Sequence, residues 1–311
     1  MRYKYLFGPV ASRRLGVSLG VDIVPHKTCS MDCVYCECGR TTDLTVKRRE
    51  YVPARSVIRE LSDFLGKKPE LDYITFSGSG EPTLNSGIGR IISYLKKNFP
   101  AYKVALITNG SMFYDASVRG DALGADLVMP SLDAVSGVNL GRINRPFRGL
   151  EGWRIVDGLV RFRRMFKGEI WLEIFIVPGV NDSAGELKLL ASAARKIRPD
   201  RIQINALDRP GTEKWVVPAG IEKLEKIAKY FGPAAEVIAK PRPSGKKSPR
   251  MKKTGSGVLS IIRRRPCTFD ELLAATRLSA GELRKQIGVF LKDEKIFTEL
   301  LPRGRFFRAK K

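Results

Sequence analysis

Short apolar runs alternate with amphipathic stretches through the first three quarters of the chain. Continuous apolar runs predict buried strands, and apolar residues that recur every three or four positions predict helices. On this basis we predict strands at residues 19–24, 72–76, 103–108, 126–131, 169–177 and 201–205. Helices are predicted at residues 55–65, 88–98, 185–196 and 221–231. Regular alternation of strands and helices predicts an α/β fold with a parallel sheet and crossover helices.

Polar, glycine-bearing segments follow several of these strands. They are residues 77–82, Asn109 with Gly110, Asp133, and residues 178–182. In α/β barrels, the carboxyl ends of the strands form the edge at which active sites are built. The sequence therefore predicts a functional site at this edge, formed by about six βα units, which is fewer than a closed eight-fold barrel needs.

The alternating pattern stops at residues 239–250, where proline, glycine, serine and basic residues prevent both periodicities. Such a segment is typical of a linker between domains. We therefore predict a domain at residues 1–238, a basic linker at 239–253 and a second domain at 254–311.

The second predicted domain begins with a helix at residues 255–265. Thr268 with Glu271, and Ser279 with Glu282, have the spacing of two capping boxes, each of which starts a helix. A Pro-Arg-Gly turn at 302–304 then separates two short apolar runs, which predicts a hairpin with a basic tip. Three helices followed by a two-stranded wing predict a winged helix-turn-helix. Modules of this outline bind nucleic acid in some proteins and dock proteins in others.

The 311-residue chain is 43% hydrophobic, which is enough for a substantial core. Its net charge of +24 is unevenly spread, because residues 241–311 have 19 Lys and Arg against 6 Asp and Glu. A basic segment of this density favours a polyanionic partner, with nucleic acid first. The sequence has no apolar run of about 18 residues and no signal-peptide stretch. We therefore expect a cytoplasmic protein that does not associate with membranes.

Three of the five cysteines, Cys29, Cys33 and Cys36, lie in one CxxxCxxC run. Three thiolates on a short loop can bind three irons of a cubane cluster and leave the fourth iron open. The alternative is zinc, but a closed zinc site needs four nitrogen or sulfur ligands, usually as paired units. Only Cys38 and His26 are near enough in the sequence to supply a fourth ligand, and no second pair follows. Iron–sulfur ligation therefore fits the spacing better than zinc.

The CxxxCxxC run, with an aromatic residue before its last cysteine, resembles the cluster motif of the radical S-adenosylmethionine (SAM) enzymes. The resemblance covers about residues 7–231 and implies a partial (β/α)6 barrel of TIM-like form. It also implies two cofactors, a 4Fe–4S cluster and SAM. In that family, one electron splits SAM, and the resulting radical abstracts a hydrogen atom from a substrate. The electron donor would be a flavodoxin- or ferredoxin-like protein.

The same resemblance implies roles for single residues near the motif. Cys29, Cys33 and Cys36 would each bind one iron, and Tyr35 would lie beside the adenine of SAM. The segment at 77–82 is similar to the glycine-rich motif of the family, which ends in Gly-Glu. Its members Gly78 and Gly80 would present backbone polar groups to SAM, and Glu81 would accept from the methionine ammonium.

Further candidates for SAM binding follow the later strands. Asn109 and Ser131 resemble family positions that contact the ribose or the methionine end of SAM. Arg142 or Arg145 would pair with the SAM carboxylate, because a guanidinium matches a carboxylate with two hydrogen bonds. Asn181, with Asp182, would contact the ribose hydroxyls, although this pair is also common helix-capping chemistry.

The substrate is less constrained by the sequence. The opening at residues 7–16, followed by the cysteine loop, resembles a group of Fe–S oxidoreductases related to the tRNA wyosine-forming radical SAM enzymes. With the basic C-terminal segment, this favours tRNA or another nucleic acid, with substrate contacts expected at Asn205, Asp208 and Arg209. One alternative is a radical SAM enzyme that acts on a protein or small molecule, with the winged helix as a docking module. Another is a DNA-binding regulator whose cluster senses redox state or SAM without cleaving SAM.

Overall fold

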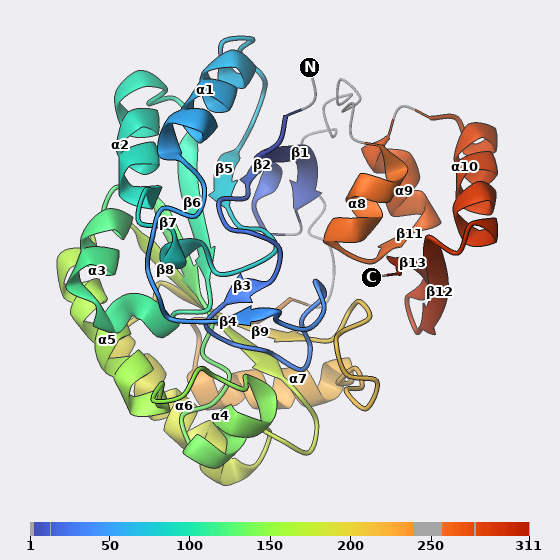
Figure 1. Ribbon diagram of the computed structural model, residues 1–311. Helices are drawn as coiled ribbons and strands as arrows, with labels where there is room; N and C mark the ends of the chain where they lie inside the picture. The colour runs from blue at the N-terminus through green and yellow to red at the C-terminus, as the bar shows by residue number, and fades with distance from the viewer. Residues whose placement is uncertain (1–2, 13, 239–256, 277, 311) are drawn as a thin grey trace.

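The computed structural model describes residues 3–12, 14–238, 257–276 and 278–310. The linker predicted at 239–253 lies outside these residues, and the division into domains stays a prediction. Eight strands form the main sheet in the order β1-β2-β5-β6-β7-β8-β9-β10, with β1 and β10 as its ends in the described chain (Figure 1). β1 runs antiparallel to β2, and the other neighbours are parallel, which confirms the predicted parallel α/β sheet.

The strands of the main sheet are β1 (Leu6–Ser12), β2 (Gly16–Val21), β5 (Tyr73–Phe76), β6 (Lys103–Thr108), β7 (Leu127–Pro130), β8 (Glu169–Ile176), β9 (Arg201–Ala206) and β10 (Ala235–Val237). The helices that follow them are α1 (Ala54–Leu65), α2 (Ile88–Asn98), α3 (Ala116–Ala122), α4 (Gly137–Ile143), α5 (Gly152–Met165), α6 (Ala184–Ile197) and α7 (Ile221–Ala228). Short 3-10 turns lie at η1 (Pro82–Leu84), η2 (Ser111–Tyr114) and η3 (Lys229–Phe231). A small separate sheet pairs β3 (Thr28–Cys29) with β4 (Asp43–Leu44).

Each face of the main sheet contributes to a different apolar core. Val104 and Leu106 of β6 belong to the large cluster under the helices, whereas Ala105 between them belongs to a smaller cluster on the opposite face. This division follows from the alternation of side chains along a strand. Figure 1 shows α1 to α6 on the outer side of the curved sheet, so the smaller cluster fills its inner side.

The structure adds elements that the periodicity did not predict. The largest is α5, whose buried residues have helical spacing but whose sequence contains Gly158 in the middle. Glycine weakens a helix, which hid the signal. Here it is required, because a Cβ at Gly158 would lie 2.6 Å from the backbone of Phe113 and Tyr114. The predicted strand at 19–24 was placed too late, since β2 begins at Gly16 and ends at Val21.

A C-terminal module follows at residues 257–310. It consists of α8 (Val258–Arg264), β11 (Cys267–Thr268), α9 (Phe269–Ala275), α10 (Ala280–Lys292), β12 (Ile296–Leu301) and β13 (Gly304–Ala309). Both capping boxes are confirmed, and the hairpin forms a three-stranded sheet with β11. The module has its own apolar core, which includes Val258, Leu272 and Leu283. Its helices and hairpin match the predicted outline, while the winged-helix assignment stays a prediction.

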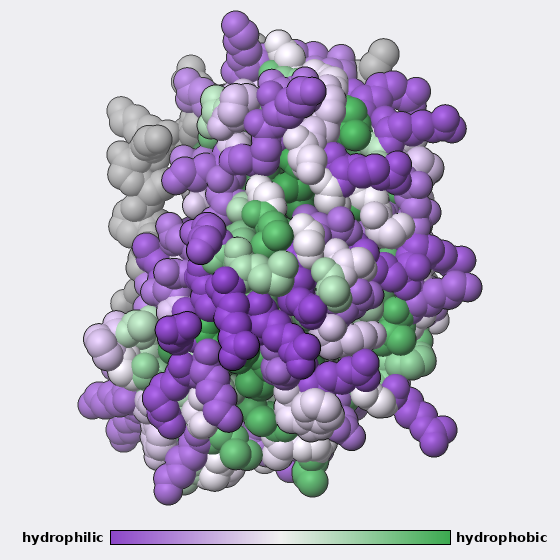
Figure 2. Space-filling model, turned by 90° about the vertical axis from the view of Figure 1, so that its left-hand side faces the viewer, coloured by the Kyte–Doolittle hydropathy of each residue, from purple (hydrophilic) through white to green (hydrophobic). Residues whose placement is uncertain are grey.

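The surface is strongly polar on the side covered by α2, α3 and α5. Figure 2 shows this face, where hydrophilic side chains predominate and apolar ones form small separate areas. Within the described residues, no helix is both long enough and apolar enough to cross a membrane.

Candidate functional site

The cysteine loop, residues 27–40, is fixed to the main sheet on three sides. Towards the loop after β5, the Lys27 amide donates to the Ser79 carbonyl at 2.8 Å. Towards the end of α4, the Val34 amide donates to the Ile143 carbonyl at 2.9 Å. Towards the segment after β9, the Thr212 hydroxyl donates to the Cys36 carbonyl at 3.1 Å. The three cysteines are therefore placed at the carboxyl ends of several strands, as the sequence predicted for the functional edge.

The glycines after β5 allow this close approach. A Cβ at Gly80 would lie 2.1 Å from the carbonyl oxygen of Thr28, which directly precedes Cys29. A Cβ at Gly78 would lie 2.3 Å from the side chain of Asp22 at the end of β2. A side chain at Gly80 would collide with the backbone of Thr28, so the glycine-rich segment and the cysteine loop lie backbone to backbone there, whereas the neighbour of Gly78 is the Asp22 side chain.

Each of the three thiols has its own nitrogen donor. Cys36 Sγ accepts from Lys27 Nζ at 3.1 Å, Cys29 Sγ from Asn109 Nδ2 at 3.5 Å, and Cys33 Sγ from Asn144 Nδ2 at 3.4 Å. The three donors come from three places in the fold: the loop itself, the end of β6 and the end of α4. N–H donors stabilise the thiolate form and tune a metal bound to it. The donor set therefore fits a thiolate-bound cluster.

The thiols differ in acidity when no metal neutralises them. A hydrogen bond from the Cys38 thiol, together with the Lys27 ammonium, lowers the pKa of Cys36 to about 5. Burial, and then the charge of Glu81, raises the pKa of Cys29 to about 12. Burial also raises the pKa of Cys33 well above its ordinary value. A positively charged cofactor would compensate these buried thiolates.

Glu81 is buried and accepts four hydrogen bonds within the protein. Its Oε1 accepts from the amide and hydroxyl of Thr83 at 3.0 and 2.6 Å and from the Thr108 hydroxyl at 2.7 Å. Its Oε2 accepts from the Asn109 amide at 2.7 Å. The carboxylate thus joins the ends of β5 and β6 and sets the position of Asn109, which donates to Cys29. Only Oε2 has capacity for a further donor, so the predicted contact with an ammonium is restricted to that atom.

Tyr35 belongs to a second buried network. Its ring stacks on Phe175, with centroids 3.8 Å apart, and its hydroxyl donates to Asp133 Oδ2. The same carboxylate accepts from Asn144 Nδ2 at 2.7 Å and from the Phe175 amide at 2.9 Å. Burial raises the pKa of Asp133 to about 6. Asp133 thus organises both Tyr35 and the donor to Cys33, and neither Asn144 nor Lys27 was a sequence candidate.

Three further candidates have different surroundings. Ser131 lies at the predicted edge, where it forms a β-bridge with Glu173. Arg142 is exposed at the end of α4, and the described residues provide no ion pair for it. Asn181 is 0% exposed, and its amide bonds to the Val177 amide and to the carbonyls of Asp133 and Phe175. The turn after β8 uses the whole side chain of Asn181, so this arrangement does not support the expected ribose contact, which stays a prediction.

The other charged candidate residues at this edge form ion pairs within the protein. Arg145 pairs with Glu213 at 2.7 Å, and Asp182 pairs with Lys223. The expected substrate residues Asp208 and Arg209 both contact the C-terminal module instead of an open surface. Their expected role as direct substrate contacts is therefore not supported by their positions.

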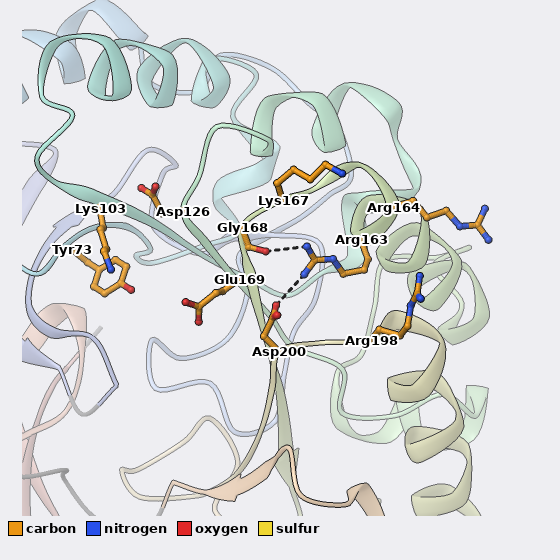
Figure 3. A pocket seen from close by; sticks show the side chains of 10 residues that line it. All are labelled: Tyr73, Lys103, Asp126, Arg163, Arg164, Lys167, Gly168, Glu169, Arg198 and Asp200. Carbon is orange, nitrogen blue, oxygen red and sulfur yellow. Dashed lines mark hydrogen bonds and ion pairs between the residues drawn. The ribbon is translucent and has the colours of Figure 1, made fainter.

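A separate cavity lies at the opposite edge of the sheet. Figure 3 shows it at the amino ends of the strands, lined by residues such as Tyr73, Lys103 and Glu169, with a volume of about 660 Å³. One of its guanidiniums, Arg163, is held by Asp200 at 3.0 Å. No thiol lines it, so it is not part of the cysteine site.

The zinc alternative finds no support in the geometry. Among the residues that the structure describes, no three His, Cys, Asp or Glu side chains converge on the position of a single ion. Thiolates that bind different irons of a cluster do not need to converge on one point.

The sequence matches the radical SAM superfamily over residues 23–191. A UPF0026 protein of Methanocaldococcus jannaschii is 36% identical over 75% of this chain and 72% of its own length. A protein of Brachyspira hyodysenteriae named GTPase Obg is 39% identical over 97% of this chain, which spans only 44% of that protein. That relative is named a GTPase, and in a phosphate-binding P-loop a Gly-Lys pair is followed by Ser or Thr. Neither Gly-Lys pair of this chain is followed by either residue.

Solved structures show the same fold at low sequence identity. A radical SAM methyltransferase from Sphaerobacter thermophilus aligns over 71% of this chain and 65% of its own, with a TM-score of 0.56 and 15% identity. SuiB of Streptococcus suis bound to S-adenosylmethionine aligns over 68% of this chain and 46% of its own, with a TM-score of 0.50 and 14% identity.

The matched region and the parallel sheet define the class of the protein: this chain belongs to the radical SAM superfamily. The cofactors of that superfamily are a 4Fe–4S cluster and SAM. The two cofactors expected from the cysteine motif are thereby confirmed at the level of the family.

Proposed function

We propose that Cys29, Cys33 and Cys36 bind a 4Fe–4S cluster and that the edge around them binds SAM. The observation that supports this assignment is that each of these thiols has a separate nitrogen donor, held by a different part of the fold. A structural zinc site would not need an open side next to a glycine-rich backbone segment. Here that segment lies directly against the cysteine loop.

When bound, the two cofactors supply a radical that abstracts a hydrogen atom from a substrate. The residues of the chain bind, orient and shield. Gly78 and Gly80 leave backbone groups accessible to SAM, and Glu81 holds Asn109 against Cys29. Tyr35 is fixed by stacking and by Asp133, so its position beside the cysteines is rigid. Ser131 and Arg142 complete the proposed SAM edge, Arg142 with a guanidinium that suits a carboxylate.

Nucleic acid, with tRNA first, is the substrate class that we propose. Exposed cations on α10 support it, namely Arg284, Lys285 and Lys292. The likeness of residues 7–16 to the group related to wyosine-forming enzymes supports it as well. The resemblance implies a second cluster in the archaeal wyosine-forming enzymes themselves, and the two remaining cysteines of this chain, Cys38 and Cys267, are too few to bind one. The resemblance therefore supports the chemistry more than the wyosine reaction itself.

A second candidate is action on a protein, with the C-terminal module as the docking part. Two observations favour it: Leu300 on β12 is 76% exposed, and Arg303 at the tip of the hairpin forms an ion pair with Asp208 of the segment after β9. Binding to tRNA that falls steeply between 50 and 200 mM salt, roughly the range over which phosphate contacts weaken, supports the first candidate. Absent or salt-independent binding supports the second.

The central test is anaerobic reconstitution with iron and sulfide, followed by SAM, a reductant and an assay for 5′-deoxyadenosine. The wild-type chain should hold the cluster and form 5′-deoxyadenosine. Alanine at Cys29, Cys33 or Cys36 should abolish both. Alanine at Cys267, which is buried in the core of the C-terminal module, is the matched cysteine control and should preserve both. A cluster that binds SAM without cleaving it would favour the regulator instead.

A further inference from the structure

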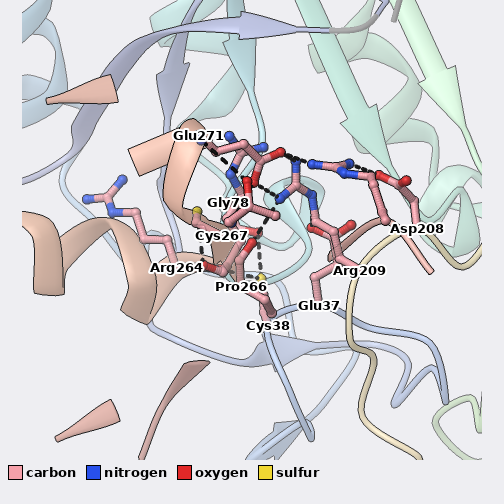
Figure 4. Close-up of polar contacts among 12 residues, drawn as sticks. Glu37, Cys38, Gly78, Asp208, Arg209, Arg264, Pro266, Cys267 and Glu271 are labelled. Carbon is pink, nitrogen blue, oxygen red and sulfur yellow. Dashed lines mark hydrogen bonds and ion pairs between the residues drawn. The ribbon is translucent and has the colours of Figure 1, made fainter. Parts of the chain in front are cut away.

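Arg209 connects the main sheet to the C-terminal module. Its guanidinium is 5% exposed and forms two hydrogen bonds of 2.5 Å to the carboxylate of Glu271 on α9. It also donates to the Pro266 carbonyl at 2.9 Å. Figure 4 shows this arrangement, with Arg209 directed from the segment after β9 towards α9. A two-pronged, buried pair of this kind is a strong and directional contact.

Further charges extend this pair into a cluster of alternating sign. Arg303, at the tip of the hairpin, forms ion pairs with both Glu271 and Asp208. On the other side, Arg209 Nε lies 3.6 Å from the carboxylate of Glu37. The cluster thus contains two residues from the module, two from the segment after β9, and one from the cysteine loop. Glu37 lies between Cys36 and Cys38 in the sequence.

The segment after β9 also contacts the cysteine loop through its backbone. The Thr212 hydroxyl donates to the Cys36 carbonyl, and the Glu213 amide donates to the Val34 carbonyl at 3.0 Å. At Gly211, a Cβ would lie 3.0 Å from the Cα of Tyr35. Residues 208–213 are therefore packed between the C-terminal module and the loop that carries the thiols.

A direct contact between the two parts lies nearby. Cys38 Sγ lies 3.3 Å from the carbonyl oxygen of Arg264 on α8, and the Arg264 guanidinium lies 4.6 Å from the centroid of the Phe7 ring on β1. The module thus contacts β1, the cysteine loop and the segment after β9. Since β1 lies at one end of the main sheet and β9 is next to the other, the module bridges both.

We propose that Arg209 is a positioning residue that couples docking of the C-terminal module to the geometry of the cysteine loop. A buried guanidinium requires a carboxylate partner. If Glu271 loses its charge, Arg209 must turn towards Glu37 or towards solvent, and residues 208–213 must move with it. Those residues hold Val34 and Cys36 by hydrogen bonds, so the loop loosens. The functional consequence rests on the proposed role of Cys36 as a cluster ligand, whereas the coupling itself does not.

Hydrogen exchange of the full chain tests the coupling, with and without the reconstituted cluster. In Glu271→Gln, the side chain can still accept at the capping box of α9, so the helix is preserved while the charge is lost. We expect at least about a hundredfold faster exchange in residues 33–40 and 207–213 as well as in 264–272, the effect of removing one buried charged partner. The electron paramagnetic resonance spectrum of the reduced cluster should also shift.

The matched control is Glu299→Gln, which removes a carboxylate from a pair with Arg308 inside the hairpin, 2.7 Å apart. It should change exchange only in the hairpin. Arg303→Gln leaves the capping box untouched and should give a smaller increase in the same three segments as Glu271→Gln. The coupling would be overturned if exchange in Glu271→Gln and in Arg303→Gln became faster only within residues 257–310. This outcome would leave the cluster assignment intact. If instead none of the cysteine variants lost iron, the cluster assignment would be rejected and the exchange result would stand.

Discussion

Replacement of Glu81 by glutamine tests how far the strand ends control the cofactor site. Glu81 accepts four hydrogen bonds, of which two come from backbone amides, those of Thr83 and Asn109. Hydroxyl donors can rotate, but a backbone amide cannot. The glutamine NH₂ group must occupy one of the two oxygen positions, and each of these faces a backbone N–H. In either orientation, therefore, one buried amide loses its acceptor.

The magnitude follows from the burial of the site. Glu81 is 2% exposed, so water cannot replace the lost acceptor. A buried donor left without a partner costs about 1–3 kcal/mol, and bonds to a charged group are worth about 1.5–3 kcal/mol. We expect Glu81→Gln to lower the free energy of unfolding by about 3 kcal/mol. For a chain of this size, that corresponds to a fall of about 1 M in the urea midpoint.

The effect should reach the cofactor through Asn109. When the Asn109 amide moves away from position 81, its side chain shifts from Cys29, to which it donates at 3.5 Å. Glu81→Gln should therefore retain less iron after reconstitution and require more SAM for half-maximal 5′-deoxyadenosine formation. The control is Asp126→Asn at the opposite edge, where Asp126 accepts from the Val104 amide at 2.7 Å. Normal iron content and SAM dependence in Glu81→Gln, with stability lowered as expected, would refute the link through Asn109.

Three further predictions concern neighbouring groups. Asp133→Asn should change the free energy of unfolding of the cluster-free chain by less than about 1 kcal/mol, because Asn144 Oδ1, which is buried and has no hydrogen-bond partner among the described residues, can accept from the new amide once the Asn144 side-chain amide turns over; urea unfolding measures this. Cys38→Ala should keep its iron and its 5′-deoxyadenosine formation, whereas loss of iron would identify Cys38 as a ligand. Burial opposes the charge of Glu271, but the Arg209 hydrogen bonds lower its pKa to about 2 from the ordinary 4.5. Its stabilisation is thus present above pH 4.5 and lost as the pH falls towards 2, so exchange in residues 264–272, corrected for intrinsic rates, should rise over that range.

The sequence predicted the parallel sheet well because its strands are short, apolar and separated by amphipathic helices. It predicted α2 and β6 with their observed bounds. It failed where local composition opposes the element. Gly158 weakens the signal of α5, and the seven-residue helices α3 and α4 are too short for periodicity to show. β1 was missed because Gly8 and Pro9 interrupt its apolar pattern, and its register shifts between Phe7 and Val10.

From spacing alone, the candidate site could be predicted only where its residues are close in the sequence, whereas Glu81 and Asn109 were expected from the family resemblance. Cys29, Cys33 and Cys36 are close in the chain, so their spacing indicates a shared ligand. Asn144 is 111 positions from Cys33, and nothing in its local sequence marks it as a partner of a thiol. Asn181 differs, since its local sequence suits both a ligand contact and a turn. In the structure its side chain is buried and bonded within the turn.

The parallel sheet explains how residues far apart in the sequence meet at the site. In a parallel sheet, every βα unit brings one strand end to the same edge, so groups separated by a whole helix become neighbours. Glu81 after β5 holds Asn109 after β6, and Asn109 donates to Cys29. Asp133 after β7 holds Asn144, which donates to Cys33. Each of these two series of hydrogen bonds connects a buried carboxylate to a thiol through an asparagine. The carboxylates therefore act on the proposed cluster without touching it, which explains why full burial of Glu81 and Asp133 is compatible with a functional role.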